Sequence, residues 1–128
     1  MKVLIDSHVF LWWVLEEPRL TPAMREIISD GGNEILFSAA SAYELAYKAA
    51  DGRLTLPEDA QSYITDRLDA NGFDPLPVDI GHALTAALLP RIHRDPFDRL
   101  LVAQAQREGI PILTADPVIA RYDVETIS

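Results

Sequence analysis

The sequence predicts one α/β domain over residues 1–128, a three-layer α/β/α sandwich around a central, mostly parallel sheet. Two observations support this fold class. Short apolar runs with the length of buried strands alternate with segments of helical periodicity, which is typical of parallel sheets covered by helices on both faces. A chain of 128 residues is also long enough to bury an ordinary hydrophobic core.

Start and stop signals bound the elements. A strand is expected over residues 2–6, and Ser7 is expected to cap a helix that ends before Pro18. Thr21 and Pro22 open a second helix, which ends at Gly31 and Gly32. The later elements are expected as a strand at 34–38, a helix at 39–51, an extended segment at 54–56, a helix at 57–70, an edge strand at 73–78, a helix at 79–89, a helix that begins around Asp98 and ends at Gly109, a strand at 110–114, a helical turn at 117–122 and a strand at 124–127.

The helix expected over residues 7–16 is apolar on every face and contains Trp12 and Trp13. Such a helix must be covered on all sides. The sandwich itself could cover it, or part of it could lie in an interface with a second subunit or another partner.

Composition excludes several classes of protein. Without cysteine the chain has no disulfide, no zinc-thiolate site and no thiol nucleophile. The apolar run at residues 3–15 contains Asp6 and His8 and is too short to span a bilayer, so we expect a cytoplasmic protein with no membrane contact. The formal net charge of −9 argues against tight, sequence-independent binding to nucleic acid, but it does not exclude catalysis on one.

Four carboxylates are expected at one rim of the sheet. Asp6 follows the first strand and Asp116 follows the penultimate one, and sites in parallel sheets gather at the carboxyl ends of the strands. Glu44 and Asp98 lie near the starts of helices on the same rim. Because like charges this close need a raised pKa or a cation between them, we predict a site for Mg²⁺ or a similar ion. The chemistry that suits it is hydrolysis of a phosphodiester by a metal-activated water.

Each acid also has a purely structural explanation. Asp6, Asp98 and Asp116 could cap helices, and Ser41-x-x-Glu44 matches a capping box.

Residues of the charged loop before the helix at Asp98 could likewise be structural or functional. Asp95 could be a turn residue before Pro96, and His93 could contact phosphate or pair with Asp95. Arg94 and Arg99 give this loop local positive charge that opposes the global sign.

Four segments together resemble the PIN domain of VapC-type toxins from bacterial toxin–antitoxin pairs. The most specific is His-Arg-Asp-Pro-Phe-Asp-Arg at 93–99, and the likeness runs to about residue 122. It implies an endoribonuclease that depends on Mg²⁺ or Mn²⁺, cuts RNA, is inhibited by a cognate antitoxin and forms a homodimer, for which the helix with Trp12 and Trp13 is a candidate interface. The segments are 3–12, 38–48, 93–105 and 113–116.

The resemblance also assigns residues by position. The catalytic and metal-binding acids are Asp6, Glu44, Asp98 and Asp116, and Asp95 is an alternative ligand or a support behind them. Further residues are expected to support the site or contact substrate, namely Ser7, Arg94, Arg99 and Thr114.

Rival functions fit less well. A phosphate-accepting signalling domain needs a lysine after a late strand, whereas the two lysines here are Lys2 and Lys48. A phosphatase of the haloacid dehalogenase type needs a second acid two residues after the first, where this chain has His8. A non-catalytic binding module of the same fold is disfavoured because all four acids are present.

Overall fold

A five-stranded parallel sheet forms the middle layer of the protein in the computed structural model, which describes residues 1–128. Its strand order is β3-β2-β1-β4-β5. The chain therefore builds outward from β1 in one direction, then crosses back and builds outward in the other. The strands are β1 (Lys2–Ile5), β2 (Glu34–Ser38), β3 (Asp74–Leu76), β4 (Ile112–Leu113) and β5 (Thr126–Ile127).

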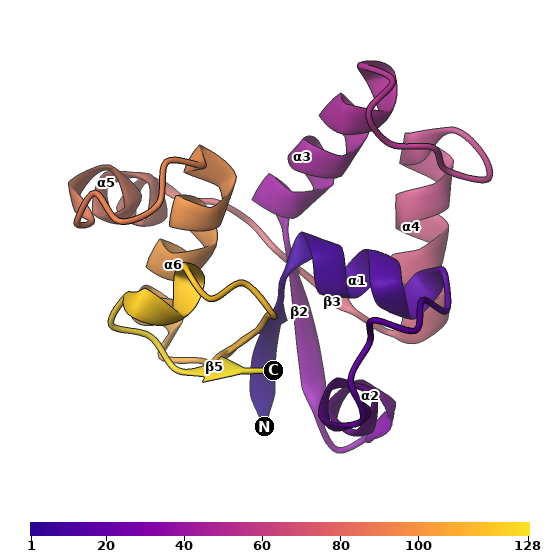
Figure 1. The fold of residues 1–128 in the computed structure, drawn as a ribbon, viewed down its shortest axis with the longest axis horizontal. Coiled ribbons are helices and arrows are strands. Elements are labelled where there is room, and N and C mark those ends of the chain that lie inside the picture. Colours follow the sequence, from indigo (N-terminus) through magenta and orange to yellow (C-terminus); the bar gives the residue numbers. More distant parts are fainter.

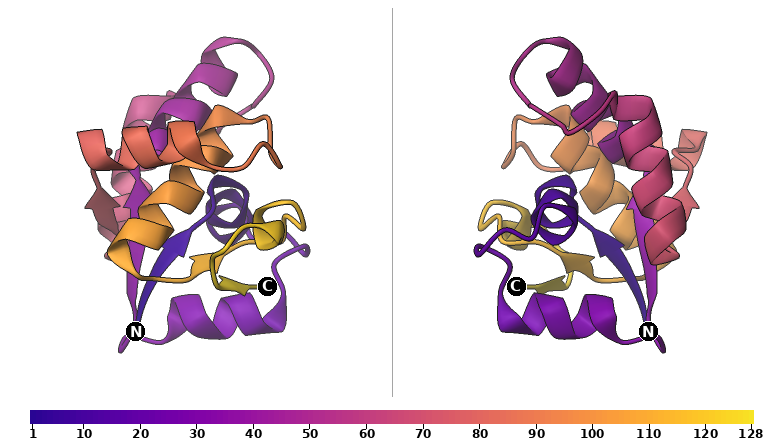
Figure 2. Two further views of the ribbon diagram at one scale, coloured as in Figure 1. Left: turned by 90° about the vertical axis from the view of Figure 1, so that its left-hand side faces the viewer. Right: turned by 90° about the vertical axis from the view of Figure 1, so that its right-hand side faces the viewer.

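Helices cover both faces of this sheet, which confirms the predicted three-layer architecture. Figure 1 shows α5 and α6 on one side of the strands and α1, α2 and α4 on the other. The side views in Figure 2 show α3 above the carboxyl ends of the strands and α2 at their amino ends. The helices are α1 (Ser7–Val14), α2 (Pro22–Ser29), α3 (Ala39–Ala50), α4 (Ala60–Asn71), α5 (Ile80–Leu88) and α6 (Pro96–Glu108), with a 3₁₀ turn at Ile119–Arg121.

Alternation along β1 divides the hydrophobic core in two. Val3 and Ile5 pack with α1, α2 and α4, whereas Leu4 points to the opposite face and packs with α5 and α6. All three side chains are fully buried. The central strand is therefore held from both faces, which fixes the position of the residue that follows it, Asp6.

Two helix caps differ from the sequence prediction. Asp6, not Ser7, caps α1, and its Oδ1 accepts a hydrogen bond from the His8 amide at 3.3 Å. Asp95 caps α6 through a 2.9 Å bond from the Phe97 amide, so Asp98 lies inside the first turn of that helix.

The capping box offered as the structural alternative for Glu44 is not observed. Ser38 caps α3 by accepting a hydrogen bond from the Ala40 amide, so Glu44 lies in the middle of the helix. Helix α4 begins at Ala60 after its cap Asp59, later than expected, and residues 54–56 form no strand.

The apolar helix α1 is partly covered by its own domain. Trp12 and Trp13 are half-buried against the core beneath α1, and the Trp13 indole donates to Asn71 Oδ1 at 2.9 Å. The predicted interface at this helix stays a prediction. None of the helices combines the length and the apolar character that crossing a membrane requires.

Candidate active site

Asp6 lies at the border between β1 and β4, where the direction of sheet building reverses. Such switch points are where parallel sheets bind ligands, because the loops after neighbouring strands diverge there. The side chain is only 2% exposed, and its Oδ2 accepts a 2.6 Å hydrogen bond from the Thr114 hydroxyl. Burial alone would raise the pKa of Asp6, but hydrogen bonding from His8 and Thr114 and the nearby His8 ring outweigh it, so the pKa is lowered.

Thr114 connects the two acids that follow β1 and β4. Its hydroxyl donates to Asp6 and accepts a 3.1 Å hydrogen bond from the Asp116 amide. The predicted neighbourhood of Asp6 and Asp116 is therefore observed, and one buried hydroxyl fixes it.

Glu44 approaches from α3 and is 1% exposed. Its Oε1 accepts a 2.8 Å hydrogen bond from the Ser7 hydroxyl, and its Oε2 lies 2.6 Å from the Lys48 ammonium one helical turn away. Ser7 also lies 3.3 Å from Asp6 Oδ1, but its single proton favours the nearer carboxylate. Ser7 thus joins Glu44 to Asp6, and Lys48 offsets part of the negative charge.

Asp98 completes the group from the first turn of α6, at 6% exposure. Burial raises its pKa, and the negative charges of Asp95, Asp6, Glu44 and Asp116 raise it further, to about 8. The four acids Asp6, Glu44, Asp98 and Asp116 are hereafter the acidic cluster.

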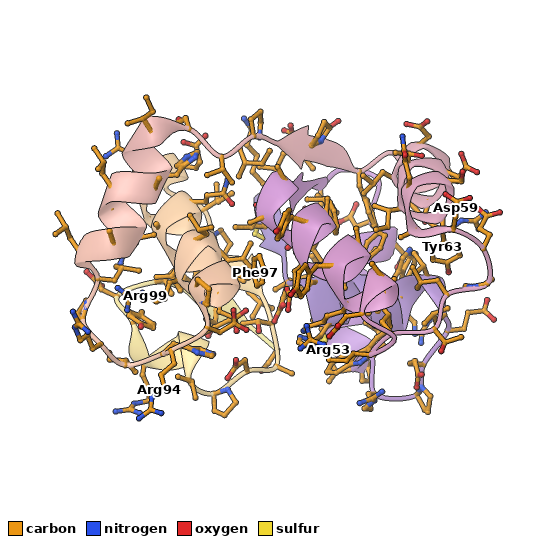
Figure 3. All side chains as sticks on the ribbon, turned by 90° about the horizontal axis from the view of Figure 1, so that it is seen from above. Arg53, Asp59, Tyr63, Arg94, Phe97 and Arg99 are labelled. Atoms are coloured by element: carbon orange, nitrogen blue, oxygen red, sulfur yellow. The ribbon has the colours of Figure 1, made fainter.

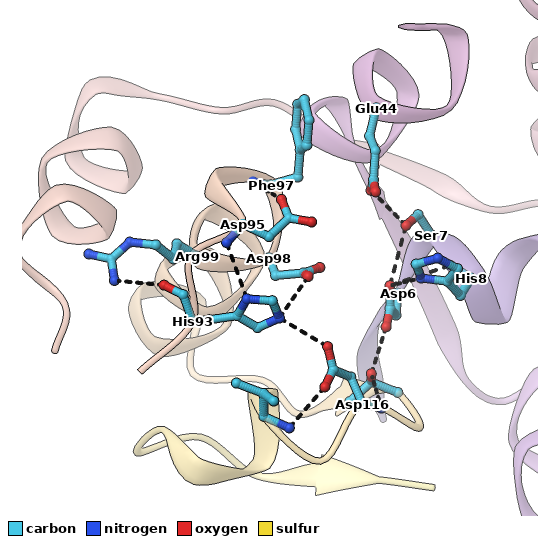
Figure 4. Close-up of polar contacts among 12 residues, drawn as sticks. Asp6, Ser7, His8, Glu44, His93, Asp95, Phe97, Asp98, Arg99 and Asp116 are labelled. Carbon is cyan, nitrogen blue, oxygen red and sulfur yellow. Dashed lines mark hydrogen bonds and ion pairs between the residues drawn. The ribbon is translucent and has the colours of Figure 1, made fainter. Parts of the chain in front are cut away.

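His93 reaches into the acidic cluster from the loop before α6. Its Nε2 lies 3.0 Å from Asp98 Oδ2 and 3.1 Å from Asp116 Oδ2, as Figure 4 shows. The sequence suggested a contact with phosphate or a pairing with Asp95. The Asp95 backbone amide, and not its carboxylate, contacts the ring by donating to Nδ1 at 3.2 Å, and the contact with phosphate stays a prediction. The bridge between Asp98 and Asp116 was missed, because spacing along a loop does not reveal where a ring points.

The model of the PIN domain family matches residues 3–125 of the chain. This chain belongs to the PIN domain family.

Individual relatives agree with this assignment. The PIN domain is 34% identical to Ribonuclease VapC22 of Mycobacterium tuberculosis over 118 residues, which cover 89% of this chain and 86% of that protein. DNA-bound VapBC from Salmonella typhimurium contains a chain with a TM-score of 0.73 at 16% identity, covering 99% of this chain and 97% of that one. The structure of VapBC2 from Rickettsia felis bound to a promoter DNA fragment contains a chain with a TM-score of 0.72 at 14% identity. The match covers 99% of this chain and 98% of that one. These two likenesses show the fold.

The two arginines expected to support the site, Arg94 and Arg99, have other surroundings in this PIN domain. Arg94 is exposed at the outer edge of the molecule in Figure 3. The guanidinium of Arg99 donates to the carbonyls of Ala86 at 2.7 Å, Leu89 at 3.0 Å and Pro90 at 3.0 Å, at the end of α5. Arg99 therefore clamps the end of α5, and its expected contact with substrate stays a prediction.

The donor set of this PIN domain fits a hard divalent cation. Every acid of the acidic cluster offers carboxylate oxygens, the ligands that Mg²⁺ and Mn²⁺ prefer. Atoms of His93, Asp98 and Asp116 that could act as ligands lie within 4.8 Å of one another. The raised pKa of Asp98 is the kind of electrostatic cost that a cation removes.

Proposed function

We propose that this PIN domain is a divalent-metal-dependent endoribonuclease that acts in the cytoplasm as the toxin of a toxin–antitoxin pair. One observation carries the proposal: the buried carboxylates of Asp6, Glu44 and Asp98 and the partly buried carboxylate of Asp116 converge at the switch point of the sheet. Burial and the neighbouring acids together raise the pKa of Asp98 to about 8. A relative named as a ribonuclease, identical at 34% of 118 aligned positions, supports RNA as the substrate.

The residues of the acidic cluster have separable roles in this proposal. Asp98 and Asp6 would hold Mg²⁺ or Mn²⁺, and Glu44 and Asp116 would complete the negative field around it. A bound cation of this kind supplies activation of water and neutralisation of charge on the phosphodiester. Asp98 has Oδ1 free for the ion, because His93 contacts only its Oδ2.

Supporting residues fix these oxygens before the ion arrives. Ser7 and Thr114 orient Glu44 and Asp6 through buried hydroxyl bonds. Asp95 holds the start of α6, and hence Asp98, by capping the helix. A prepared arrangement of ligands reduces the reorganisation that binding requires.

The rival phosphotransfer reading gains no support from the lysines. Lys48 pairs with Glu44 at 2.6 Å, and Lys2 lies on the surface 3.9 Å from Glu34. Neither is a free ammonium beside an acceptor aspartate.

Two protein partners belong to the proposal. A cognate antitoxin would place a cationic side chain against the acidic cluster and so compete with metal and RNA, which suits the net charge of −9. A second copy of the chain would cover an apolar stripe on α5, where Ile80, Leu84 and Leu88 are 79%, 61% and 85% exposed. The helix with Trp12 and Trp13 stays the alternative surface for either partner.

The decisive test replaces Asp98 with asparagine. Asp98→Asn removes a metal ligand without changing side-chain volume, so cleavage of single-stranded RNA in Mg²⁺ or Mn²⁺ should fall by at least about 100-fold. Gel assays with EDTA as the blank measure this, and circular dichroism checks that the variant folds.

A matched control makes the same change on the surface. Asp66→Asn alters an exposed aspartate of α4, and its cleavage rate should equal that of the wild type. Full activity in a folded Asp98→Asn protein would refute the site assignment.

A further inference from the structure

The proton on His93 has one location that the hydrogen bonds allow. The backbone amide of Asp95 points its N–H at His93 Nδ1 over 3.2 Å, so Nδ1 must be the acceptor. A neutral imidazole that accepts at Nδ1 carries its proton on Nε2. His93 Nε2 is therefore a donor, and it faces Asp98 Oδ2 at 3.0 Å and Asp116 Oδ2 at 3.1 Å.

The Nε2–H donor contacts one oxygen of each of two carboxylates and leaves the other oxygen of each turned away from the ring. The Oδ2 atoms of Asp98 and Asp116 both turn toward the ring of His93. Asp116 Oδ1 accepts a 2.8 Å bond from the Val118 amide, so both of its oxygens are held. Asp98 keeps only Oδ1 without a partner in the protein, and the ring fixes the plane of this carboxylate.

The backbone of His93 is anchored as firmly as its ring. Its amide donates to the Tyr122 hydroxyl at 2.7 Å, and that hydroxyl donates to the Pro90 carbonyl at 3.0 Å. Arg99, which clamps the end of α5, also reaches the His93 carbonyl at 3.5 Å. Hydrogen bonds to the backbone and to Nδ1 therefore fix the orientation of the ring.

We propose that His93 is a positioning residue of the metal site: as a fixed Nε2–H donor it holds the Asp98 carboxylate in the orientation that leaves Oδ1 for the ion and fixes Asp116 beside it, and it is not itself a nitrogen ligand. The inference rests on the proposed function, because it concerns the same ion. Two other roles of His93 differ from this one. In the first, His93 binds the metal through Nε2, and in the second its ring occupies the metal position until the ion displaces it.

The tautomer can be measured in the metal-free protein. Long-range ¹H–¹⁵N correlation NMR with EDTA present should show the His93 proton on Nε2, with Nδ1 as the unprotonated nitrogen, and the signal should be absent from His93→Ala. A proton on Nδ1 would leave Nε2 open as a ligand and would overturn the inference.

Mn²⁺ titration then tests the consequence for binding. His93→Ala should weaken Mn²⁺ binding by about 10-fold or more, as losing a partner behind a metal ligand does. His93→Gln keeps an N–H donor at about the place of Nε2, so it should retain most of the wild-type affinity. Equal affinity in His93→Ala and wild type would overturn positioning, and tighter binding in His93→Ala would show that the ring occupies the metal place.

Pulsed electron paramagnetic resonance of bound Mn²⁺ separates donor from ligand. The wild type should show no ¹⁴N coupling of a directly bound imidazole, and a coupling lost in His93→Gln would overturn the inference. A wild type that binds no Mn²⁺ would instead refute the proposed function itself. Binding that is unchanged in His93→Ala would refute the inference while the proposed function stands.

Discussion

Asp6 and Asp98 show how differently two buried carboxylates of one acidic cluster can behave. Asp6 accepts hydrogen bonds that stabilise its charged form, and its pKa is lowered. Asp98 is surrounded by other acids and by apolar atoms, and its pKa is raised to about 8. At neutral pH the metal-free protein therefore keeps a proton on Asp98 while Asp6 is ionised.

This difference predicts a pH dependence of stability. The pKa of Asp98 is above its unfolded value, so its favourable contribution is complete below about pH 4 and is lost as the pH rises through about 8. Asp6 is ionised in both states above pH 6 and contributes no slope there. In EDTA, the free energy of unfolding should fall by roughly 2–3 kcal/mol from pH 6 to pH 9, measured by urea denaturation.

The control for this prediction is Asp98→Asn. That variant lacks the Asp98 carboxyl and keeps His8, whose pKa is raised by Asp6, so its stability should fall less than that of the wild type across the same range. Wild-type and variant curves that run parallel would show that Asp98 does not titrate in this window.

At the scale of elements, α3 carries its own counter-charge. Lys48 and Glu44 are one turn apart on α3, and their exposures of 28% and 1% make the pair partly buried. Removing one partner of such a pair leaves a buried charge without compensation, which costs more than the pair itself contributes.

Lys48→Met should therefore destabilise the metal-free protein by about 2 kcal/mol, measured by urea denaturation. Lys2→Met is the matched control, because Lys2 and Glu34 form an exposed pair at 3.9 Å. That change should cost less than ~1 kcal/mol. Equal losses in the two variants would mean that Glu44 does not depend on Lys48.

The end of α5 depends on a different element. Arg99 of α6 supplies planar donors to the carbonyl of Ala86 in the last turn of α5 and to those of Leu89 and Pro90 just beyond it. Arg99→Lys keeps the charge but loses this geometry, so it should cost about 1–3 kcal/mol in thermal or urea unfolding. Arg94→Lys, on an exposed side chain, should be neutral, and a neutral Arg99→Lys would contradict the clamp.

The sequence predicts the elements better than their caps. Alternating apolar runs and helical periodicity identified all five strands and six helices. The choice between Asp95 and Asp98 as the cap of α6 could have been made from Pro96, which favours the first helical position and places the cap one residue earlier. The choice between Asp6 and Ser7 could not, because adjacent residues that both cap well are separated only by tertiary bonds.

The candidate site, too, could be predicted from the sequence only in part. The convergence of the acids could be predicted because strand order and the rim of the sheet are topological properties. The ring of His93 and the hydroxyls of Ser7 and Thr114 could not be placed, because their partners lie 23, 37 and 108 positions away. Their contacts depend on rotamers that the fold selects.

At the scale of the whole molecule, the exposed apolar stripe on α5 predicts self-association. Leu88→Glu places a charge at the most exposed position of that stripe, 85% exposed, and should shift the protein toward monomer in sedimentation velocity. Gln61→Glu adds the same charge on an exposed position of α4 and should leave association unchanged. A monomeric wild type, or a Leu88→Glu protein that associates as the wild type does, would contradict this interface.

The 2.6 Å bond between Thr114 and Asp6 joins positions 108 residues apart, and it has a consequence for synthesis. A ribosome releases Asp6 early, but β4 and Asp116 emerge only after nearly the whole of residues 1–128 has been made. On the proposed function, nuclease activity would therefore begin only after β4 has left the ribosome and paired with β1.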